Sequence, residues 1–188
     1  MNKDLFIIFL LFVFIYNFYE NNKLKLELKY LRVINKYTPL NNYNKVFKNL
    51  YIGNSVNILN ENFINKHNIK LIINCSQRLP FIKKKNICKY RIPVKDDLSS
   101  RTNLILFKNL DKTGYLINLY LKNNKGVYVH CVAGMQRSAT IIAGYLMKYK
   151  NLSKEDAIKY LKRKRMQVFF PVVNYDSVLS IYEDKLSA

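Results

Sequence analysis

The residues with the clearest chemical potential lie in one short segment, His130 to Ser138, which reads HCVAGMQRS. Cys131 follows an apolar stretch, five residues that include Gly134 come next, and Arg137 and Ser138 open a second apolar stretch. If the first stretch is a strand and the second a helix, the backbone N–H groups between them can turn toward one anion. Glycine permits the positive φ that such a turn needs, and the helix N-terminus adds a positive dipole end. The segment therefore predicts an anion cradle with Cys131 at its base.

Arg137 and Cys131 indicate which anion this cradle would bind. The planar guanidinium group matches two oxygens of a phosphate, and the positive field favours the Cys131 thiolate, a nucleophile that can accept a phosphoryl group. The alternative is a structural cysteine at a strand end and an arginine on a helix surface. At about 5% usage per residue type, the five fixed identities have a chance expectation on the order of 10⁻⁵ to 10⁻⁴ in a chain of this length. We therefore favour phosphoryl transfer.

A phosphoryl transfer of this kind also needs a proton donor, because an alkoxide or phenolate leaves phosphorus readily only when its bridging oxygen is protonated. Asp96 and Asp97 are the candidates, adjacent on a polar stretch that follows an apolar one. The residue types alone leave both open, since one of the two can be a solvated loop aspartate.

The elements that must position these groups alternate between apolar strands and amphipathic helices. Strands are expected at 50–52, 70–75, 88–93 and 127–130. Helices are expected at 55–66, 138–148 and 153–165, and in at least the second half of the apolar segment 104–121. A last helix is expected to end at about residue 186 and to be capped by Asn174. Strands separated by helices form parallel sheets with helices packed on their faces. We predict an α/β domain over residues 45–188, with a mainly parallel central sheet flanked by helices.

Composition bounds the class of protein. The chain has 188 residues, enough for one domain and a short extension, and a net charge of +20 from 32 basic and 12 acidic side chains. Such charge suggests an acidic partner without specifying it. The three cysteines, Cys75, Cys88 and Cys131, lack CxxC spacing and the chain has only two histidines, which argues against a disulfide framework and against a metal site. Cys75 and Cys88 are either structural or redox partners of Cys131.

Residues 1–22 form a hydrophobic N-terminal segment whose apolar core is 5–19, and the Asn- and Lys-rich residues 23–44 are expected to be a tether. The 15 apolar residues would span roughly 22 Å as a helix, which is a marginal membrane span. The absence of Ala, Gly and Ser before Gly53 disfavours a cleaved signal peptide. We favour an uncleaved membrane anchor, with the positive flank and the rest of the chain in the cytoplasm. The alternative is a hydrophobic helix that packs on the domain or lies in the membrane interface.

At His130–Ser138 the sequence resembles the cysteine-based protein tyrosine phosphatase superfamily, whose motif is HCxxxxxR[ST], and within it the dual-specificity phosphatases. The resemblance covers about residues 45–186. Further matches lie at 49–54 (NLYIGN), 72–74 (IIN), 91–96 (RIPVKD) and 144–147 (GYLM). The resemblance implies a protein tyrosine phosphatase-like fold that needs no metal and no cofactor.

The resemblance also implies a role for each site residue. Cys131 attacks phosphorus, Asp96 is selected as the general acid by its register with the family's IPxxD pattern, and Ser138 donates a hydrogen bond to the departing sulfur. His130 braces the loop. The implied phosphate-binding residues are Val132, Ala133, Gly134, Met135, Gln136 and Arg137.

The residues between Cys131 and Arg137 include no Lys or Arg, whereas phosphoinositide phosphatases of the superfamily place basic residues there. RNA 5′-phosphatases place His and Asn where this chain has Ala133 and Gln136. We therefore expect a phosphoprotein substrate, with phosphotyrosine and phosphoserine or phosphothreonine both accepted. Two functions of a different class stay open, a catalytically silent phosphate-binding module and, more weakly, a nucleic-acid binder. The basic run Lys159, Lys162, Arg163, Lys164 and Arg165 is interpreted as a solvated helix face.

Overall fold

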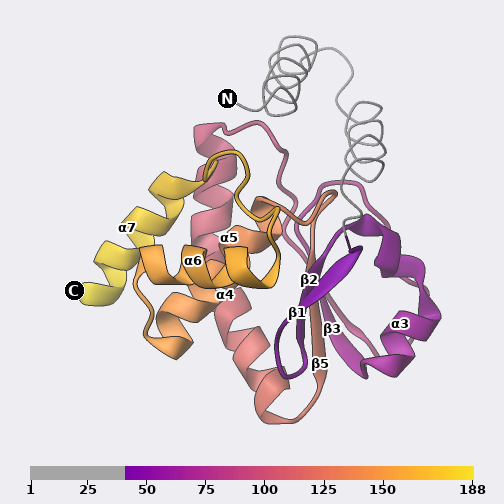
Figure 1. Ribbon diagram of the computed structural model, residues 1–188. Coiled ribbons are helices and arrows are strands. Elements are labelled where there is room, and N and C mark those ends of the chain that lie inside the picture. The colour runs from indigo at the N-terminus through magenta and orange to yellow at the C-terminus, as the bar shows by residue number, and fades with distance from the viewer. Residues whose placement is uncertain (1–40) are drawn as a thin grey trace, which may run out of the picture. The chain divides into compact units, whose positions relative to one another are not determined.

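The computed structural model describes residues 41–188, which form an α/β domain (Figure 1). Its five-stranded sheet has the order β1-β2-β5-β3-β4, in which β1 pairs with β2 in antiparallel fashion and all other pairs are parallel. The predicted fold class, with its mainly parallel central sheet, is confirmed. The strands are β1 (Tyr43–Phe47), β2 (Leu50–Gly53), β3 (Ile69–Asn74), β4 (Cys88–Arg91) and β5 (Gly126–His130). The helices are the 3₁₀ helix η1 (Ser55–Leu59), α3 (Glu61–Lys66), α4 (Ser100–Lys122), α5 (Arg137–Lys150), α6 (Lys154–Lys164) and α7 (Asp176–Ser187).

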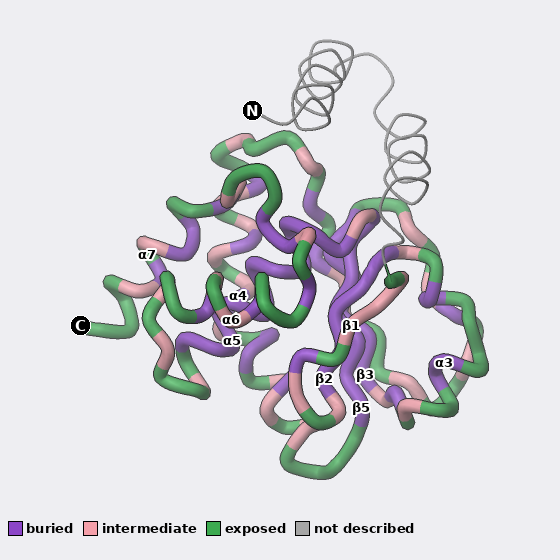
Figure 2. Tube along the Cα trace, viewed as in Figure 1, coloured by how far each residue is buried: buried purple, intermediate pink, exposed green. Residues whose placement is uncertain are grey.

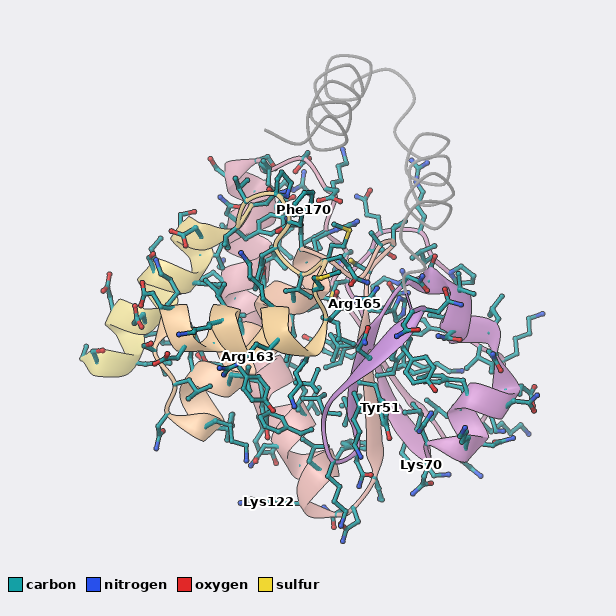
Figure 3. The ribbon with its side chains drawn as sticks, viewed as in Figure 1. Tyr51, Lys70, Lys122, Arg163, Arg165 and Phe170 are labelled. Carbon is teal, nitrogen blue, oxygen red and sulfur yellow. The ribbon has the colours of Figure 1, made fainter. Side chains whose placement is uncertain are left out.

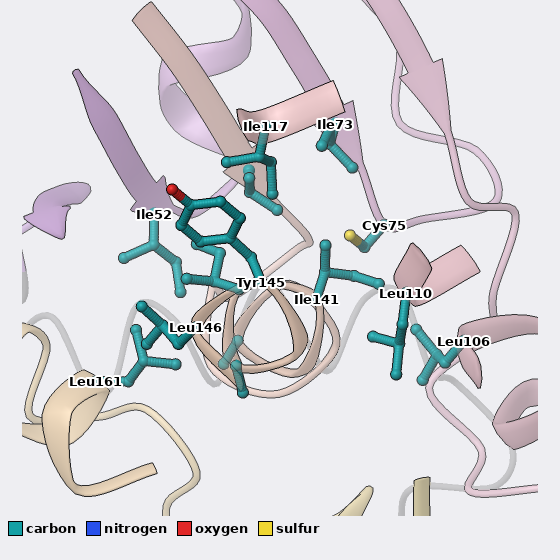
Figure 4. Packing of buried hydrophobic residues seen from close by; sticks show 14 of the residues in the cluster. Ile52, Ile73, Cys75, Leu106, Leu110, Ile117, Ile141, Tyr145, Leu146 and Leu161 are labelled. Carbon is teal, nitrogen blue, oxygen red and sulfur yellow. The ribbon is translucent and has the colours of Figure 1, made fainter. Parts of the chain in front are cut away.

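Strand β5 lies at the centre of the sheet and every residue in it is buried, as its uninterrupted run GVYVH predicts for a strand covered on both faces (Figure 2). Alternate side chains of the strands enter two different cores. One core lies against α3 and contains Ile72, Tyr128 and Phe63. The other lies against α4 and α5 and includes Ile73 of β3 and Ile141 of α5 (Figure 4). The loop after β5 therefore leaves from the most deeply buried part of the fold.

Most element boundaries lie within two residues of the sequence-based expectations, and three differences have a local explanation. The helix expected over 55–66 is divided at Asn60, whose backbone is extended and whose side chain caps α3 by accepting from Phe63 N. Helix α4 includes the whole of the apolar segment 104–121 and begins four residues before it, at Ser100, because Ser99 caps it by accepting from Thr102 N. Helix α7 has Tyr175 at its N-cap, so the expectation that Asn174 caps it was wrong.

The first strand is not predicted by the sequence pattern. Strand β1 includes Tyr43 and Asn44, which fall within the expected tether, and pairs with β2 at the edge of the sheet. The expected hydrophobic segment 5–19 lies outside the described residues. Within 41–188, none of the helices combines the length and the apolar character that a membrane crossing demands.

Candidate functional site

The site is built on the loop that joins β5 to α5. Cys131 follows the last residue of β5 and is 2% exposed, and α5 begins at Arg137, as the spacing predicts. Gly134 has φ +69°, the positive value expected for this turn. A Cβ atom at Gly134 would lie 2.3 Å from the carbonyl oxygen of Gly53, so both the backbone angle and the space require glycine.

Four successive carbonyl groups of this loop are bound by groups outside it. The Val132 carbonyl accepts from Ser55 N at 3.0 Å and the Met135 carbonyl from Phe169 N at 3.0 Å. The carbonyls of Ala133 and Gly134 accept from Arg165, at 3.2 and 2.9 Å. In a trans peptide the C=O and the following N–H point in opposite directions. The N–H groups of residues 133–136 therefore face away from these partners, toward the concave side of the loop, which is the arrangement of an anion-binding nest.

The Cys131 thiol lies at the base of this loop. Its Sγ atom accepts from Gly134 N at 3.2 Å and from Ser138 Oγ at 3.4 Å. A backbone N–H group and a hydroxyl group thus both donate to the sulfur, which lies beside the N-terminus of α5.

The two adjacent aspartates have different partners. The Asp96 carboxylate faces the loop: its Oδ2 atom accepts from Arg137 Nη2 at 2.9 Å, and its Oδ1 atom accepts from the Tyr175 hydroxyl at 3.1 Å. Asp97 faces the start of α4, where its Oδ1 atom accepts from Ser99 N and Oγ and from Thr102 Oγ1. The structure therefore brings Asp96 to the loop and places Asp97 against Ser99, the N-cap residue of α4, and Thr102.

His130 is fully buried and directly precedes Cys131 in the chain. Its ring stacks on Tyr128, with 5.4 Å between centroids, and its Nδ1 atom lies 3.3 Å from the Cys131 carbonyl oxygen. Burial lowers the pKa of His130 to about 4, so the imidazole is neutral near pH 7. A neutral ring in this position contacts the loop backbone without adding charge to it.

Arg165 is part of the site, although the sequence pattern places it in a solvated basic face. It is 2% exposed, and besides the two loop carbonyls it donates to Asn41 O and Asn44 Oδ1, both at 2.7 Å (Figure 3). The interpretation as a solvated face was wrong for Arg165, while the other four basic residues of that run are exposed. The signal that could have found it is the helical stripe Ala157, Leu161 and Arg165, because both apolar members are fully buried.

Gln136 connects the loop to the segment between α6 and α7, a second contact that sequence reasoning missed. Its Nε2 atom donates to the carbonyls of Phe170 and Val172 at 3.2 and 2.9 Å, and its Oε1 atom accepts from Asn174 N at 3.2 Å. Tyr175, the partner of Asp96, follows directly in the chain. The anion loop and Asp96 are therefore linked through this segment.

Cys75 lies next to the site on the strand side, where its N–H donates to the His130 carbonyl at 2.7 Å. Burial raises the pKa of the Cys75 thiol well above its ordinary value, which makes it a poor nucleophile. Cys88 is exposed, and all three cysteines are free thiols.

Known proteins are similar to this chain in sequence and in fold. The family described as "Dual specificity phosphatase, catalytic domain" matches residues 50–185. Mouse dual specificity protein phosphatase 8 is 32% identical over 76% of this chain, and the match covers 21% of its own length. The 123R protein of invertebrate iridescent virus 6, named as a tyrosine phosphatase, is 32% identical over 77% of this chain and 94% of its own.

Solved structures agree on the fold. Human DUSP28 superposes with a TM-score of 0.71 at 24% identity, covering 79% of this chain and 97% of its own. The human tyrosine phosphatase-like serine/threonine/tyrosine-interacting protein does so with a TM-score of 0.67 at 19% identity, covering 78% and 98%. A mainly parallel sheet whose central strand ends in a cysteine-to-arginine anion loop is the architecture of the cysteine-based phosphatases. Within that class, the chain belongs to the dual specificity phosphatase family.

Proposed function

We propose that the chain is a dual-specificity protein phosphatase, which hydrolyses phosphotyrosine and phosphoserine or phosphothreonine monoesters through a phosphocysteine intermediate. One arrangement carries this proposal: the Cys131 sulfur, the inward N–H groups of the loop and the Asp96–Arg137 pair all converge on one anion site. Nucleophile, oxyanion clamp and proton donor are the three parts that the reaction requires.

In the first step the Cys131 thiolate attacks phosphorus, a P–S bond forms, and the P–O bond to the leaving group breaks. Arg137 turns its fork from Asp96 to two phosphate oxygens, while the N–H groups of the loop hold the charge that redistributes over the equatorial oxygens. Protonated Asp96 gives its proton to the bridging oxygen, so the substrate leaves as a neutral tyrosine, serine or threonine hydroxyl.

In the second step the Asp96 carboxylate takes a proton from water as the water oxygen attacks phosphorus. The P–S bond breaks, inorganic phosphate is released and the thiolate is regenerated, stabilised by the Ser138 hydroxyl. Neutral His130 holds the Cys131 carbonyl and takes no proton in either step. Side chains and backbone amides of the chain itself stabilise every charge that develops in this scheme. We propose that the reaction requires neither a metal nor a cofactor.

The choice of a protein substrate rests on the loop residues between Cys131 and Arg137, which lack the cationic side chains that would meet the additional phosphates of a phosphoinositide. Phosphoinositides, 5′-phosphorylated RNA and binding without turnover are the alternatives. The experiment is a hydrolysis assay of the full chain on phosphotyrosyl and phosphoseryl peptides, phosphatidylinositol phosphates and 5′-triphosphorylated RNA. Turnover of peptides that orthovanadate inhibits is expected; preference for lipid or RNA would replace the substrate assignment.

The nucleophile is tested by Cys131→Ser, with Cys88→Ser as the matched control because Cys88 is exposed. We expect Cys131→Ser to abolish turnover and still bind phosphopeptide, and Cys88→Ser to retain both. Residual turnover in Cys131→Ser would exclude the phosphocysteine mechanism.

For the rest of the chain we propose a membrane anchor in residues 1–22, a tether in 23–44 and the catalytic domain in 45–188, facing the cytoplasm. Support comes from the apolar run 5–19 and the basic residues that follow it. The test is alkaline carbonate extraction of membranes that contain either the full chain or a chain that lacks residues 1–22. An anchored full chain stays with the membranes; release of both forms would reject the anchor.

A further inference from the structure

The two oxygens of the Asp96 carboxylate have different partners. Oδ2 pairs with Arg137, the residue next to the anion site, and Oδ1 accepts from the hydroxyl of Tyr175, which comes from the start of α7. The two partners approach the carboxylate from different elements. Oδ2 thus faces the residue that borders the anion site, and Oδ1 is held by a residue from a different segment.

Tyr175 is well suited to hold a fixed position. Its side chain is fully buried in the core that α7 shares with the sheet, and the preceding residue, Asn174, is held by Gln136. Burial raises the pKa of Tyr175 far above its ordinary value, and the negative charge of Asp96 adds to the effect. The phenol therefore stays protonated across the physiological range and remains a hydrogen-bond donor.

The hydrogen bond from Tyr175 differs from the Arg137 ion pair in what happens when a substrate arrives. On the proposed mechanism, phosphate oxygens take over the Arg137 guanidinium, and Asp96 loses that contact at the moment at which it must protonate the leaving group. A buried tyrosine cannot turn to the phosphate in the same way. We therefore expect its hydrogen bond to Oδ1 to persist while Arg137 moves from Asp96 to the phosphate.

We propose that Tyr175 is a positioning residue for the general acid, an inference that rests on the proposed function of Asp96. By fixing Oδ1, Tyr175 leaves Oδ2 as the oxygen that carries the proton to the bridging oxygen and later receives one from water. In this arrangement the Tyr175 hydroxyl orients the Asp96 carboxyl group, and the carboxyl group transfers the proton.

The test is Tyr175→Phe, which removes one oxygen atom, with Tyr182→Phe as the matched control. Tyr182 lies on the same helix, is 1% exposed, and donates its hydroxyl to Asp111 Oδ1 at 2.9 Å, outside the loop. Steady-state kinetics are measured with 4-nitrophenyl phosphate, whose leaving group needs little protonation, and with phenyl phosphate, whose leaving group needs a proton. Melting temperatures are measured for both variants.

We expect Tyr175→Phe to lower kcat for phenyl phosphate about tenfold relative to 4-nitrophenyl phosphate, a part of the roughly 10²–10⁴-fold that a general acid contributes, with KM unchanged. Tyr182→Phe should lower stability without changing the ratio between the two substrates. In an Asp96→Asn background, Tyr175→Phe should have no further effect on the ratio, because the two residues act as one unit.

Equal losses on both substrates, or additive losses in the Asp96→Asn background, would overturn the positioning role and make Tyr175 a structural residue. That result leaves the proposed function standing as long as Asp96→Asn alone impairs phenyl phosphate selectively. If Asp96→Asn spares phenyl phosphate, the proposed role of Asp96 fails, and the inference about Tyr175 fails with it.

Discussion

Arg165 and Gly134, one at the end of α6 and the other in the middle of the anion loop, are joined by a buried hydrogen bond of 2.9 Å from Nε to the carbonyl oxygen. The same guanidinium group also binds the Ala133 carbonyl and two groups of the segment before β2. Two of the four outward-facing carbonyls of the loop therefore depend on one side chain. The direction in which the loop presents its N–H groups follows from this contact.

Replacing Arg165 by methionine should cost about 3 kcal/mol in the free energy of unfolding, because it leaves buried carbonyl groups without donors. It should also weaken orthovanadate inhibition, since the N–H groups lose their fixed direction. Arg163→Met is the matched control, an exposed basic residue on the same helix, and should change neither quantity measurably. Urea unfolding and vanadate titration measure both effects. Equal behaviour of the two variants would show that Arg165 does not shape the loop.

Gly134→Ala should inactivate the protein and destabilise it by about 2 kcal/mol or more, because the new Cβ would meet the Gly53 carbonyl at 2.3 Å in a backbone conformation that alanine avoids. Gly114→Ala on α4 provides the comparison. Its Cβ would lie 3.1 Å from the ring of Tyr149, where a small shift suffices, so the change in stability should stay within about 1 kcal/mol. Thermal unfolding and phosphate hydrolysis measure the contrast, and an active Gly134→Ala variant would contradict it.

Asp96→Ala should mainly change the ratio of hydrolysis rates, and Asp97→Ala should mainly change stability, although the two residues are neighbours. Removing Asp97 deletes the acceptor for Ser99 and Thr102 and should cost about 1 kcal/mol of stability, leaving the ratio of rates on phenyl and 4-nitrophenyl phosphate unchanged. Removing Asp96 should lower that ratio by about 10²-fold with a smaller effect on stability. The reverse pattern in hydrolysis and urea unfolding would assign the acid role to Asp97.

Asp111 should make stability depend on pH within the helical layer, away from the anion loop. Burial alone would raise its pKa, but hydrogen bonds from Lys148, Lys185 and Tyr182 lower it well below the ordinary value. A carboxyl whose pKa is depressed in the folded state stabilises the fold above its unfolded pKa of about 3.9, and the contribution disappears as the pH falls through the lower folded value.

Asp111→Asn should therefore be less stable than the wild type at pH 7 by about 1 kcal/mol, a figure reduced for the solvent that reaches this site, with its side chain 38% exposed. The difference should shrink steadily below about pH 4, the unfolded pKa of the carboxyl. Melting temperatures at neutral pH and in strong acid measure it, and an equal difference under both conditions would show that the carboxylate charge has no part in it.

The loop is predictable because its chemistry is encoded in consecutive residues. Cys131, Gly134 and Arg137 are fixed by spacing, and the strand and helix on either side are strong apolar patterns. Asp96 is separated from Asp97 only by family register, since both side chains are of one type and their directions depend on how the chain leaves β4. That difference in direction is a property of the folded chain.

The supporting residues escape prediction for a different physical reason. Arg165 and Tyr175 contact the site across about thirty or more positions of sequence, and nothing local distinguishes a buried arginine from its exposed neighbours except its place on the stripe of Ala157 and Leu161. Strand β1 escapes prediction because its Asn and Lys residues have low strand propensity, which edge pairing with β2 overrides.

The side chain of Gln136 has a consequence for how such an enzyme can be altered. The Gln136 side chain makes three hydrogen bonds to the α6–α7 connection, while its backbone belongs to the anion loop. The loop sequence therefore cannot be exchanged independently of that connection. A chimera that receives the five variable residues of a relative without that relative's α6–α7 connection would lose these three hydrogen bonds, which hold the segment that leads into Tyr175. The two segments have to be inherited, or transplanted, as a single unit.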